Sequence, residues 1–301
     1  MSKLDSFNLG ELYRDLRIAR GLKMKDIVNQ NLSQAQLSKF ENGLTMLSAD
    51  KLLIAISAIH MSLAEFEHAY NQYEDSIFFK QAKKISSLHG KKDVNGLKDL
   101  LSHYDTSSES YDIYNQLNCL VIKSAIKDLE ADYPISESEI ELITAYLYSI
   151  EDWTEYELFI FGNTLQVLST SNLVFLGKAF IKRDSIYLSL PNNRHRTHLV
   201  LINIIFELIK RSQDKTAELF IKHLETILDS QDMFARAFLI FFQKILDFRN
   251  GKITQRASLE NYIQSLWSLG FNNIAAFLQD NLEDLLPNDM IVPVIPIKTR
   301  P

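Results

Sequence analysis

Residues that end helices are scarce in this chain. Only 9 glycines and 6 prolines occur among 301 residues, and four of the prolines fall within residues 287–301. Apolar residues make up 46% of the sequence, and they recur at intervals of three or four, which is the spacing of one helix face. A turn-rich sheet protein has many more glycines and prolines than this. We therefore expect an all-α protein.

Residues 1–73 show the pattern of five short helices. Gly21 and Gly43 stand where helices end, and Ser33 and Ser62 stand where a hydroxyl group caps the first amides of a helix. Glu65 completes a capping box with Ser62. The expected helices run over residues 9–20, 24–30, 33–43, 48–59 and 62–73. Together they predict one compact N-terminal domain.

The second and third of these helices have the spacing of a helix-turn-helix, which lays its second helix in the major groove of DNA. We expect Leu37, Phe40 and Glu41 to face the core. The remaining residues offer two amides, a methyl group and an ammonium group, which can contact adenine, the thymine methyl group, and guanine or phosphate. The candidate DNA contacts on this helix are Ser33, Gln34, Ala35, Gln36, Ser38 and Lys39.

The charge distribution bears on this hypothesis. The net charge of −6 argues against a general nucleic-acid binder, but residues 3–40 contain 7 basic and 4 acidic residues. A DNA-facing surface should therefore lie within this stretch. The plain alternative is that the polar face of residues 34–39 is only a solvated surface, which is common in all-helical proteins.

Beyond residue 73 the pattern changes to longer helices. A helix over residues 75–88, stopped by His89 and Gly90, lacks proline and glycine and predicts a stiff connector. From residue 169 onward, two helices recur every 38 to 41 residues. This period indicates a degenerate tetratricopeptide-like solenoid of helical hairpins. The expected domains are a helix-turn-helix domain at 1–73, a connector at 74–90, a helical-repeat sensor and dimerisation domain at 91–290, and an extended tail at 291–301.

Motifs of catalysis are missing from the sequence. We find no phosphate loop, nucleophile elbow, metal pair or glycine-rich cofactor turn, so we expect no enzyme, cofactor or metal site. His195 and His198 lie three residues apart, but no third ligand is close in sequence, so a solvated, basic helix start is favoured over a metal or phosphate site. Cys119 is the only cysteine, and its apolar surroundings predict a small core residue in a reducing compartment.

Neither an N-terminal leader nor an apolar run of about 20 residues is found, so we expect a soluble, cytoplasmic protein without a membrane partner.

Two stretches resemble known proteins. Residues 16–22, LRIARGL, and residues 32–43, LSQAQLSKFENG, resemble the lambdoid-repressor type of helix-turn-helix domain. The order of this domain and a helical solenoid to about residue 290 resembles the Rgg family of peptide-responsive regulators of Gram-positive bacteria. The segment WTEYELFIFGN at 153–163, within the solenoid, also resembles this family. The resemblance covers nearly the whole chain and is strongest in the N-terminal domain.

The repressor-like resemblance assigns roles to several charged residues. It implies a structural ion pair between Arg17 and Glu41, with a phosphate contact as the alternative role of Arg17. Arg14, one turn earlier, is the freer phosphate candidate. Many relatives have a phosphate-binding glutamine where this chain has Met24, so Lys23 or Lys25 is expected to compensate electrostatically.

The Rgg resemblance also implies a homodimer whose solenoid binds a short signalling peptide. An extended peptide needs side-chain amides or cations to satisfy its backbone and its ends. Polar residues within apolar helical stretches are the candidates, with local hydrogen bonding as the alternative for each. They are Asn163, Tyr187, Asn203 and Arg236.

Taken together, the sequence predicts a transcription regulator that binds double-stranded promoter DNA and responds to a signalling peptide, with RNA polymerase as a further partner. One alternative keeps DNA binding but gives the solenoid a role only in dimerisation or protein-partner binding. Another treats the N-terminal domain as a protein-interaction module that does not bind DNA.

Overall fold

The computed structural model describes residues 6–71, 77–105, 112–183, 188 and 191–286. The regular elements within these ranges are helices, without a strand, which confirms the expected all-α class. The chain divides into two compact units, Met1–Ser87 and Leu88–Pro301. Helix α6 (Ile77–Gly90) runs through this boundary.

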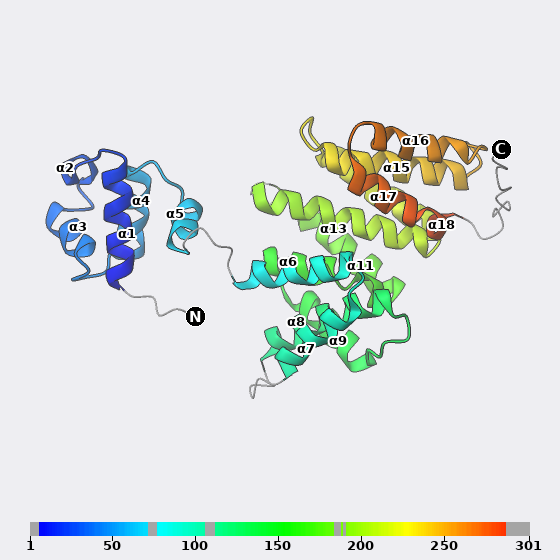
Figure 1. Ribbon diagram of the computed structural model, residues 1–301, viewed down its shortest axis with the longest axis horizontal. Coiled ribbons are helices and arrows are strands. Elements are labelled where there is room, and N and C mark those ends of the chain that lie inside the picture. The colour runs from blue at the N-terminus through cyan, green and yellow to red at the C-terminus, as the bar shows by residue number, and fades with distance from the viewer. Residues whose placement is uncertain (1–5, 72–76, 106–111, 184–187, 189–190, 287–301) are drawn as a thin grey trace, which may run out of the picture. The chain divides into compact units, whose positions relative to one another are not determined.

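Before α6, the described part of the first unit contains five helices (Figure 1). Their bounds are α1 Ser6–Ala19, α2 Met24–Ile27, α3 Gln34–Glu41, α4 Ala49–Ala58 and α5 Leu63–Tyr70. Gly21 and Gly43 have φ values of 69° after α1 and α3, a left-handed conformation that glycine adopts without strain. Ser33 and Ser62 cap α3 and α5, each within a capping box. The local signals in the sequence therefore define these helix ends.

The core of this unit lies where α1 and α3 pack together. Tyr13, Leu37 and Phe40 are fully buried in it. The two helices approach so closely that a Cβ atom on Gly10 would lie 1.9 Å from the carbonyl oxygen of Phe40. A glycine is therefore needed at this crossing, and it fixes how α3 is presented.

The second unit consists of longer helices stacked in pairs. Their bounds are α7 Val94–Asp105, α8 Ile113–Leu129, α9 Glu137–Ser149, α10 Glu155–Gly162, η1 Leu165–Val167, α11 Thr170–Arg183, α13 Pro191–Lys210, α14 Asp214–Ile227, α15 Met233–Arg249, α16 Ala257–Ser268, α17 Asn272–Asp280 and α18 Leu282–Leu285. Helix α7 packs on α8, α13 contacts α10, α14 and α15, and α16 packs on α17. Figure 1 shows α13, α15 and α16 running side by side.

Polar side chains join successive repeats. Arg211 at the end of α13 donates to the carbonyl oxygens of Leu165 and Leu168, at 3.1 and 2.8 Å. One repeat later, Arg249 at the end of α15 donates to the carbonyl oxygen of Ile209 at 2.6 Å. The partners of the Arg249 bond lie 40 residues apart in sequence, which agrees with the period expected for the solenoid.

The structure differs from the expectation at some local features. Helix α2 ends at Ile27 rather than at residue 30, because Asn29 forms a turn in which its side chain accepts from the amides of residues 31 and 32. Helix α6 continues through His89 to Gly90. Cys119 is half-buried rather than fully buried.

No single helix among those described is both long and apolar enough to cross a membrane. The α4–α5 pair passes this test only jointly, and it is bent by 95°.

Candidate functional site

A buried ion pair joins α1 to the end of α3. Both Nε and one terminal nitrogen of Arg17 donate to the carboxylate of Glu41, each at 2.7 Å. The third donor group of Arg17 reaches the carbonyl oxygen of Leu22 at 2.6 Å. Only 7% of the Arg17 side chain and 0% of the Glu41 side chain are exposed. The pair that the repressor-like resemblance implied is thus present, and it fixes the angle of α3 with two parallel hydrogen bonds.

The outer face of α3 is open to solvent. Gln34, Ala35 and Lys39 are exposed, and Ser38 is half-buried. Gln36 is also half-buried, and its side-chain oxygen accepts from the amide of Ser33 at 3.2 Å, while the Ser33 hydroxyl accepts from the Gln36 amide. Two of the six candidates on this helix therefore form its cap, and the other four present an amide, a methyl group, a hydroxyl group and an ammonium group outward.

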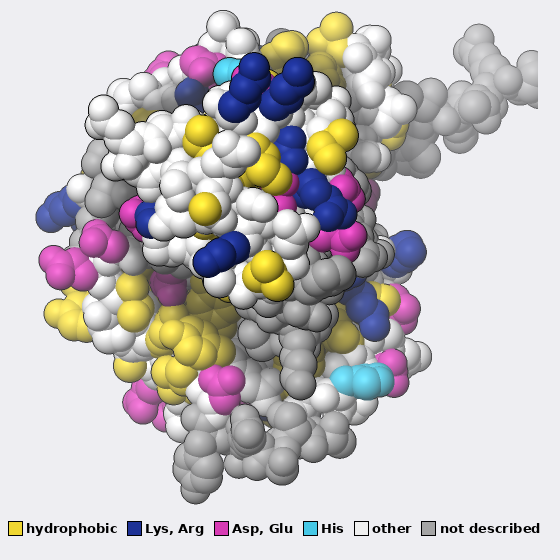
Figure 2. All heavy atoms as spheres, turned by 90° about the vertical axis from the view of Figure 1, so that its left-hand side faces the viewer, with side chains coloured by type: hydrophobic (Ala, Val, Ile, Leu, Met, Phe, Trp, Pro, Cys, Tyr) yellow, Lys and Arg dark blue, Asp and Glu magenta, His cyan; other side chains and the backbone are white. Residues whose placement is uncertain are grey.

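The basic candidates surround this helix unequally. Lys23 and Lys25 on α2 are exposed. Arg14 is half-buried and paired with Glu11 at 3.1 Å and with Asp15 at 3.6 Å. Figure 2 shows Lys and Arg side chains distributed over the face of the N-terminal unit that looks toward the viewer. Since the charge of Arg14 is already compensated, the two lysines are the better placed for phosphate oxygens.

In the second unit the structure brings Asn163 and Asn203 together. Asn203 on α13 donates from Nδ2 to the carbonyl oxygen of Gly162 at 3.1 Å, and Asn163 directly follows that residue as the C-cap of α10. The Nδ2 group of Asn163 donates to the carbonyl oxygen of Phe159 at 2.7 Å. Both asparagines are exposed. The local hydrogen bonding that was the alternative to a peptide contact is therefore present for both asparagines, while both side chains remain exposed.

Aromatic side chains continue this surface. Phe206 lies one helical turn after Asn203 on α13, and its ring centroid is 5.9 Å from that of Phe277 on α17. Phe277 packs in turn against Phe238, whose ring lies 5.1 Å from that of Phe234 on α15. Phe277 and Phe234 are 44% and 39% exposed. We call this set the amide–aromatic surface; it consists of Asn163, Asn203, Phe206, Phe234 and Phe277.

Of the other two candidates, the structure describes Arg236, which does not join this surface. Arg236 is half-buried on α15, and its guanidinium group donates to the carbonyl oxygens of Leu228 and Asp229, both at 3.4 Å. Arg236 lies two residues after Phe234 on α15, and positions i and i+2 point to different sides of a helix. Arg236 therefore faces the end of α14 rather than the side that carries Phe234. Tyr187 lies outside the described residues.

The start of α13 was expected to be solvated, but it is partly buried. Arg194 pairs with Asp229 and Asp232 at 2.7 and 2.8 Å, and Thr197 and His198 are buried. Burial lowers the pKa of His198, although Asp232 opposes this shift. Among the described residues, no group of three His, Cys, Asp or Glu side chains is arranged to hold a metal ion. The buried His198 packs where α13 contacts α15, whereas His195 is exposed.

The comparison with protein families decides the identity of the chain. The family model described as the C-terminal domain of the HTH-type transcriptional regulator Rgg matches residues 98–280. The chain belongs to the Rgg family. It is a transcription regulator of the helix-turn-helix type and not an enzyme, as the sequence predicted.

Solved structures agree with the fold of this Rgg-family regulator. The SHP pheromone receptor Rgg2 of Streptococcus dysgalactiae is 21% identical with a TM-score of 0.77, and the match covers 91% of this chain and 98% of that chain. The PrgX/cCF10 complex is matched with 16% identity and a TM-score of 0.69, covering 93% of this chain and 92% of that chain. At these identities the likeness establishes the fold, a helix-turn-helix domain followed by a helical solenoid.

The sequence reasoning missed the aromatic half of the surface in this Rgg-family regulator. Asn203 and Phe206 lie about one turn apart on α13, which would have been a usable signal. Phe234 and Phe277 carry no such signal, because only the stacking of α15 and α17 on α13 places them beside it.

Proposed function

We propose that the regulator reads promoter DNA through the exposed face of α3, as a homodimer with one recognition helix in each half-site. The observation that carries this proposal is the buried Arg17–Glu41 pair, which holds α3 rigidly while Gln34, Ala35 and Lys39 remain open to solvent. In a two-fold symmetric dimer the two recognition helices lie about 34 Å apart, one turn of the DNA helix.

Each exposed side chain on α3 has a role in this proposal. Gln34 contacts a base edge, Ala35 contacts a thymine methyl group, and Ser38 and Lys39 contact bases or phosphates. Lys23 and Lys25 contact phosphates on either side, and Arg14 contributes less because Glu11 competes for it. Ser33 and Gln36 keep the first turn of α3 in place through their capping box.

The DNA proposal is tested by binding genomic fragments to the full-length protein and to a Gln34→Ala/Lys39→Ala variant at two salt concentrations. We expect loss of fragment selectivity, with a cost of about 1–3 kcal/mol for each base contact removed. If Lys39 contacts a phosphate, its removal should also reduce the slope of log K against log salt concentration by about 1. The matched control, Gln264→Ala/Lys222→Ala, changes the same residue types at exposed positions of the second unit. Equal selectivity in the variant and the control contradicts this proposal.

We also propose that the amide–aromatic surface binds a short extended peptide. The adjacent side chains of Asn163 and Asn203 supply amide groups for the peptide backbone, and the three phenylalanines supply apolar contacts for its side chains. Arg236 and Tyr187 are further candidate contacts for the peptide in this proposal. Rgg2, which shares the fold, is described as a pheromone receptor, and PrgX was solved with cCF10.

The peptide proposal is tested with pools of short peptides from culture fluid, measured by thermal shift of the purified protein. Asn203→Ala should weaken binding about tenfold, because the peptide then leaves a buried backbone group unpaired. Asn261→Ala, at an exposed position on α16, is the matched control. If no pool stabilises the protein, the solenoid serves dimerisation or a protein partner instead.

The remaining parts of the proposal concern the setting of the molecule. The regulator acts in the cytoplasm, where promoter DNA and RNA polymerase are found, and a single half-buried cysteine suits a reducing compartment. We assign DNA binding to the first unit, and peptide binding and dimerisation to the second unit. Helix α6 is assigned the role of coupling peptide binding to DNA binding.

A further inference from the structure

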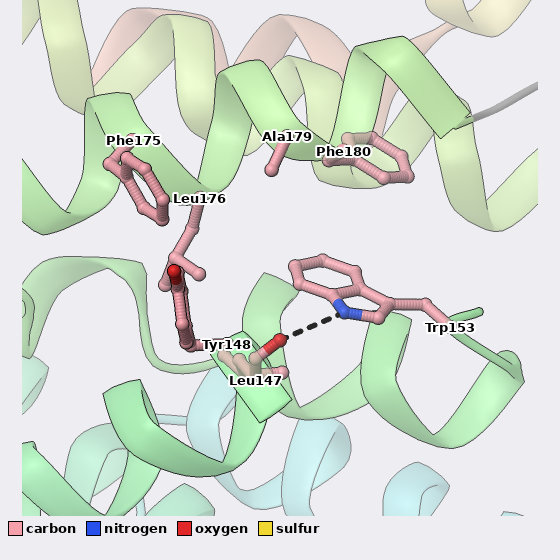
Figure 3. A pocket seen from close by; sticks show the side chains of 7 residues that line it. All are labelled: Leu147, Tyr148, Trp153, Phe175, Leu176, Ala179 and Phe180. Atoms are coloured by element: carbon pink, nitrogen blue, oxygen red, sulfur yellow. Dashed lines mark hydrogen bonds between the residues drawn. The ribbon is translucent and has the colours of Figure 1, made fainter. Parts of the chain in front are cut away.

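A separate cavity lies between α9 and α11 in the second unit. It has a volume of about 290 Å³ and is lined by seven side chains (Figure 3). Tyr148 and Phe175 form one wall, with their ring centroids 5.5 Å apart. Trp153 and Phe180 form the opposite wall, stacked at 5.8 Å with 17° between the ring planes. Figure 3 shows both ring pairs bordering the same space.

One wall of the cavity is buried and the other is exposed. Trp153 and Phe180 in the buried wall are only 5% and 2% exposed. Tyr148 and Phe175 in the other wall are 68% and 52% exposed, although large aromatic side chains are usually covered. Ala179 lies between the walls, and its small side chain leaves the space open.

Apolar and polar atoms both line the cavity, and the side chains are mainly apolar. Its seven side chains include no charged group. The indole nitrogen of Trp153 donates to the carbonyl oxygen of Leu147 at 3.1 Å, so the indole has no further donor for a ligand. The hydroxyl group of Tyr148 is the other polar side-chain atom of the lining. A charged ligand would lose its hydration here without gaining a charged side chain as a partner.

We propose that this cavity binds a neutral, planar aromatic small molecule of about two fused rings. Size supports the proposal, since an apolar cavity of about 150 Å³ accepts benzene, and this cavity has about twice that volume. Shape supports it as well, because aromatic walls on two sides favour a flat ligand in offset-stacked or edge-to-face contact. A small molecule fills the depth between the walls, whereas a flat protein surface would cover only the exposed rings of Tyr148 and Phe175.

The test uses 2-naphthol as the probe and the full-length protein, followed by calorimetry and by ligand-detected NMR. We expect saturable binding of one 2-naphthol per chain. Phenol, which fills half of the space, and 2-naphthalenesulfonate, which carries a charge, should each bind at least tenfold more weakly. Equal binding of the sulfonate would overturn the proposal of a site for neutral ligands.

Two variants locate the probe. Ala179→Leu fills the cavity from within a helix, where leucine is well tolerated, and Phe175→Ala removes an exposed wall. Each should weaken 2-naphthol binding at least tenfold without changing the melting temperature by more than a few degrees. Phe277→Ala, which removes an equally exposed phenylalanine from the amide–aromatic surface, should leave 2-naphthol binding unchanged.

Three further results would overturn the inference. They are an absence of saturable binding, binding that survives both cavity variants, and self-association that depends on Phe175 while 2-naphthol does not bind, which would identify the cavity as a contact between copies of the chain. None of these measurements involves DNA or a peptide, so the outcome is independent of the proposed function.

Discussion

The two candidate binding surfaces of this regulator are assembled over different distances along the chain. Helix α3, the proposed recognition helix, is held by Arg17 and Glu41, which lie 24 residues apart within one small domain. The amide–aromatic surface depends on a bond from Asn203 to Gly162, 41 residues earlier in the preceding repeat. The first surface is therefore defined by a contiguous motif, and the second by how repeats stack. A substitution in the first unit should accordingly destabilise that whole unit, whereas a substitution in the second unit should cause a smaller loss of stability at the repeats it contacts.

The crossing of α1 and α3 offers the strongest way to break the first unit alone. In Gly10→Ala the new methyl group would lie 1.9 Å from the carbonyl oxygen of Phe40, and a backbone atom cannot move aside as a side chain can. We expect loss of the cooperative unfolding transition of the first unit, with the transition of the second unit retained. Calorimetry of the full-length protein separates the two transitions.

Gly90→Ala is the control for this substitution. A Cβ atom at Gly90 meets nothing within 4 Å, and Gly90 is not among the glycines with positive φ, so alanine should be neutral or slightly stabilising in this helix. A normal transition of the first unit in Gly10→Ala would show that α1 and α3 can separate, and that the angle of α3 is not fixed by this contact.

Burial distinguishes the Arg17–Glu41 pair of the first unit from the exposed Lys98–Glu130 pair of the second unit. Arg17→Met leaves the buried carboxylate of Glu41 without its partner, which typically costs about 3–5 kcal/mol. Lys98→Met breaks a pair with Glu130 whose side chains are 43% and 45% exposed, and such pairs contribute about 0–1 kcal/mol. Urea unfolding followed by circular dichroism measures both. Similar losses in the two variants would contradict the structural role assigned to Arg17.

Much of the first unit could be predicted because its signals are local. The capping box of Ser33 and Gln36 and the glycine after α3 lie within a few residues of the helix that they define, and periodicity identified Leu37, Phe40 and Glu41 as its buried face. The extent of α2 was overestimated, since a four-residue helix is too short for periodicity to define its end.

The surface of the second unit could be predicted only in part. The repeat period and the two asparagines were visible in the sequence. A polar residue in an apolar stretch, however, can lie either in a core or on the solvent-exposed side of a helix. The burial of His198 has the same origin, because α15 covers the start of α13 from 38 residues farther along the chain. Only the stacking of repeats distinguishes these cases, and a single sequence does not contain that information directly.

The contacts between repeats predict an intermediate effect in the second unit. Arg211→Met removes the donors that satisfy the carbonyl oxygens of Leu165, Gln166 and Leu168 around η1. We expect a loss of about 2–3 kcal/mol, since charged hydrogen bonds of this kind contribute that order of stability. Lys252→Met, whose side chain is 70% exposed and pairs with Asp247, should change stability little. Unfolding of the second unit by urea measures the difference.

If Arg211→Met also leaves the first unit's transition unchanged, the stacking of repeats is energetically separate from the DNA-facing unit. A concerted loss in both units would instead show that they unfold together, and the contrast between local and stacked assembly would then not extend to stability.

The smallest expected effect is a pH dependence at the contact of α13 with α15. Burial lowers the pKa of His198 from its ordinary value of 6.5, against the opposing charge of Asp232, while Arg194 and His195 add to the lowering and Asp229 opposes it. Since the unfolded chain then binds a proton more readily than the folded one, stability is fully present above pH 6.5 and decreases as the pH falls below it. Thermal unfolding between about pH 7.5 and about pH 5.5 should show this decrease in the second unit.

His198→Gln removes the titrating group and should flatten part of that pH dependence, whereas His103→Gln, at an exposed position on α7, should retain it. Asp232 does not produce the same signal, because its pKa is already lowered from 3.8 and its protonation therefore lies at more acidic pH than this window. A pH profile that His198→Gln leaves unchanged would mean that the α13–α15 contact admits water when the second unit is folded. The stacking of repeats would then be looser at this contact than the burial of His198 indicates.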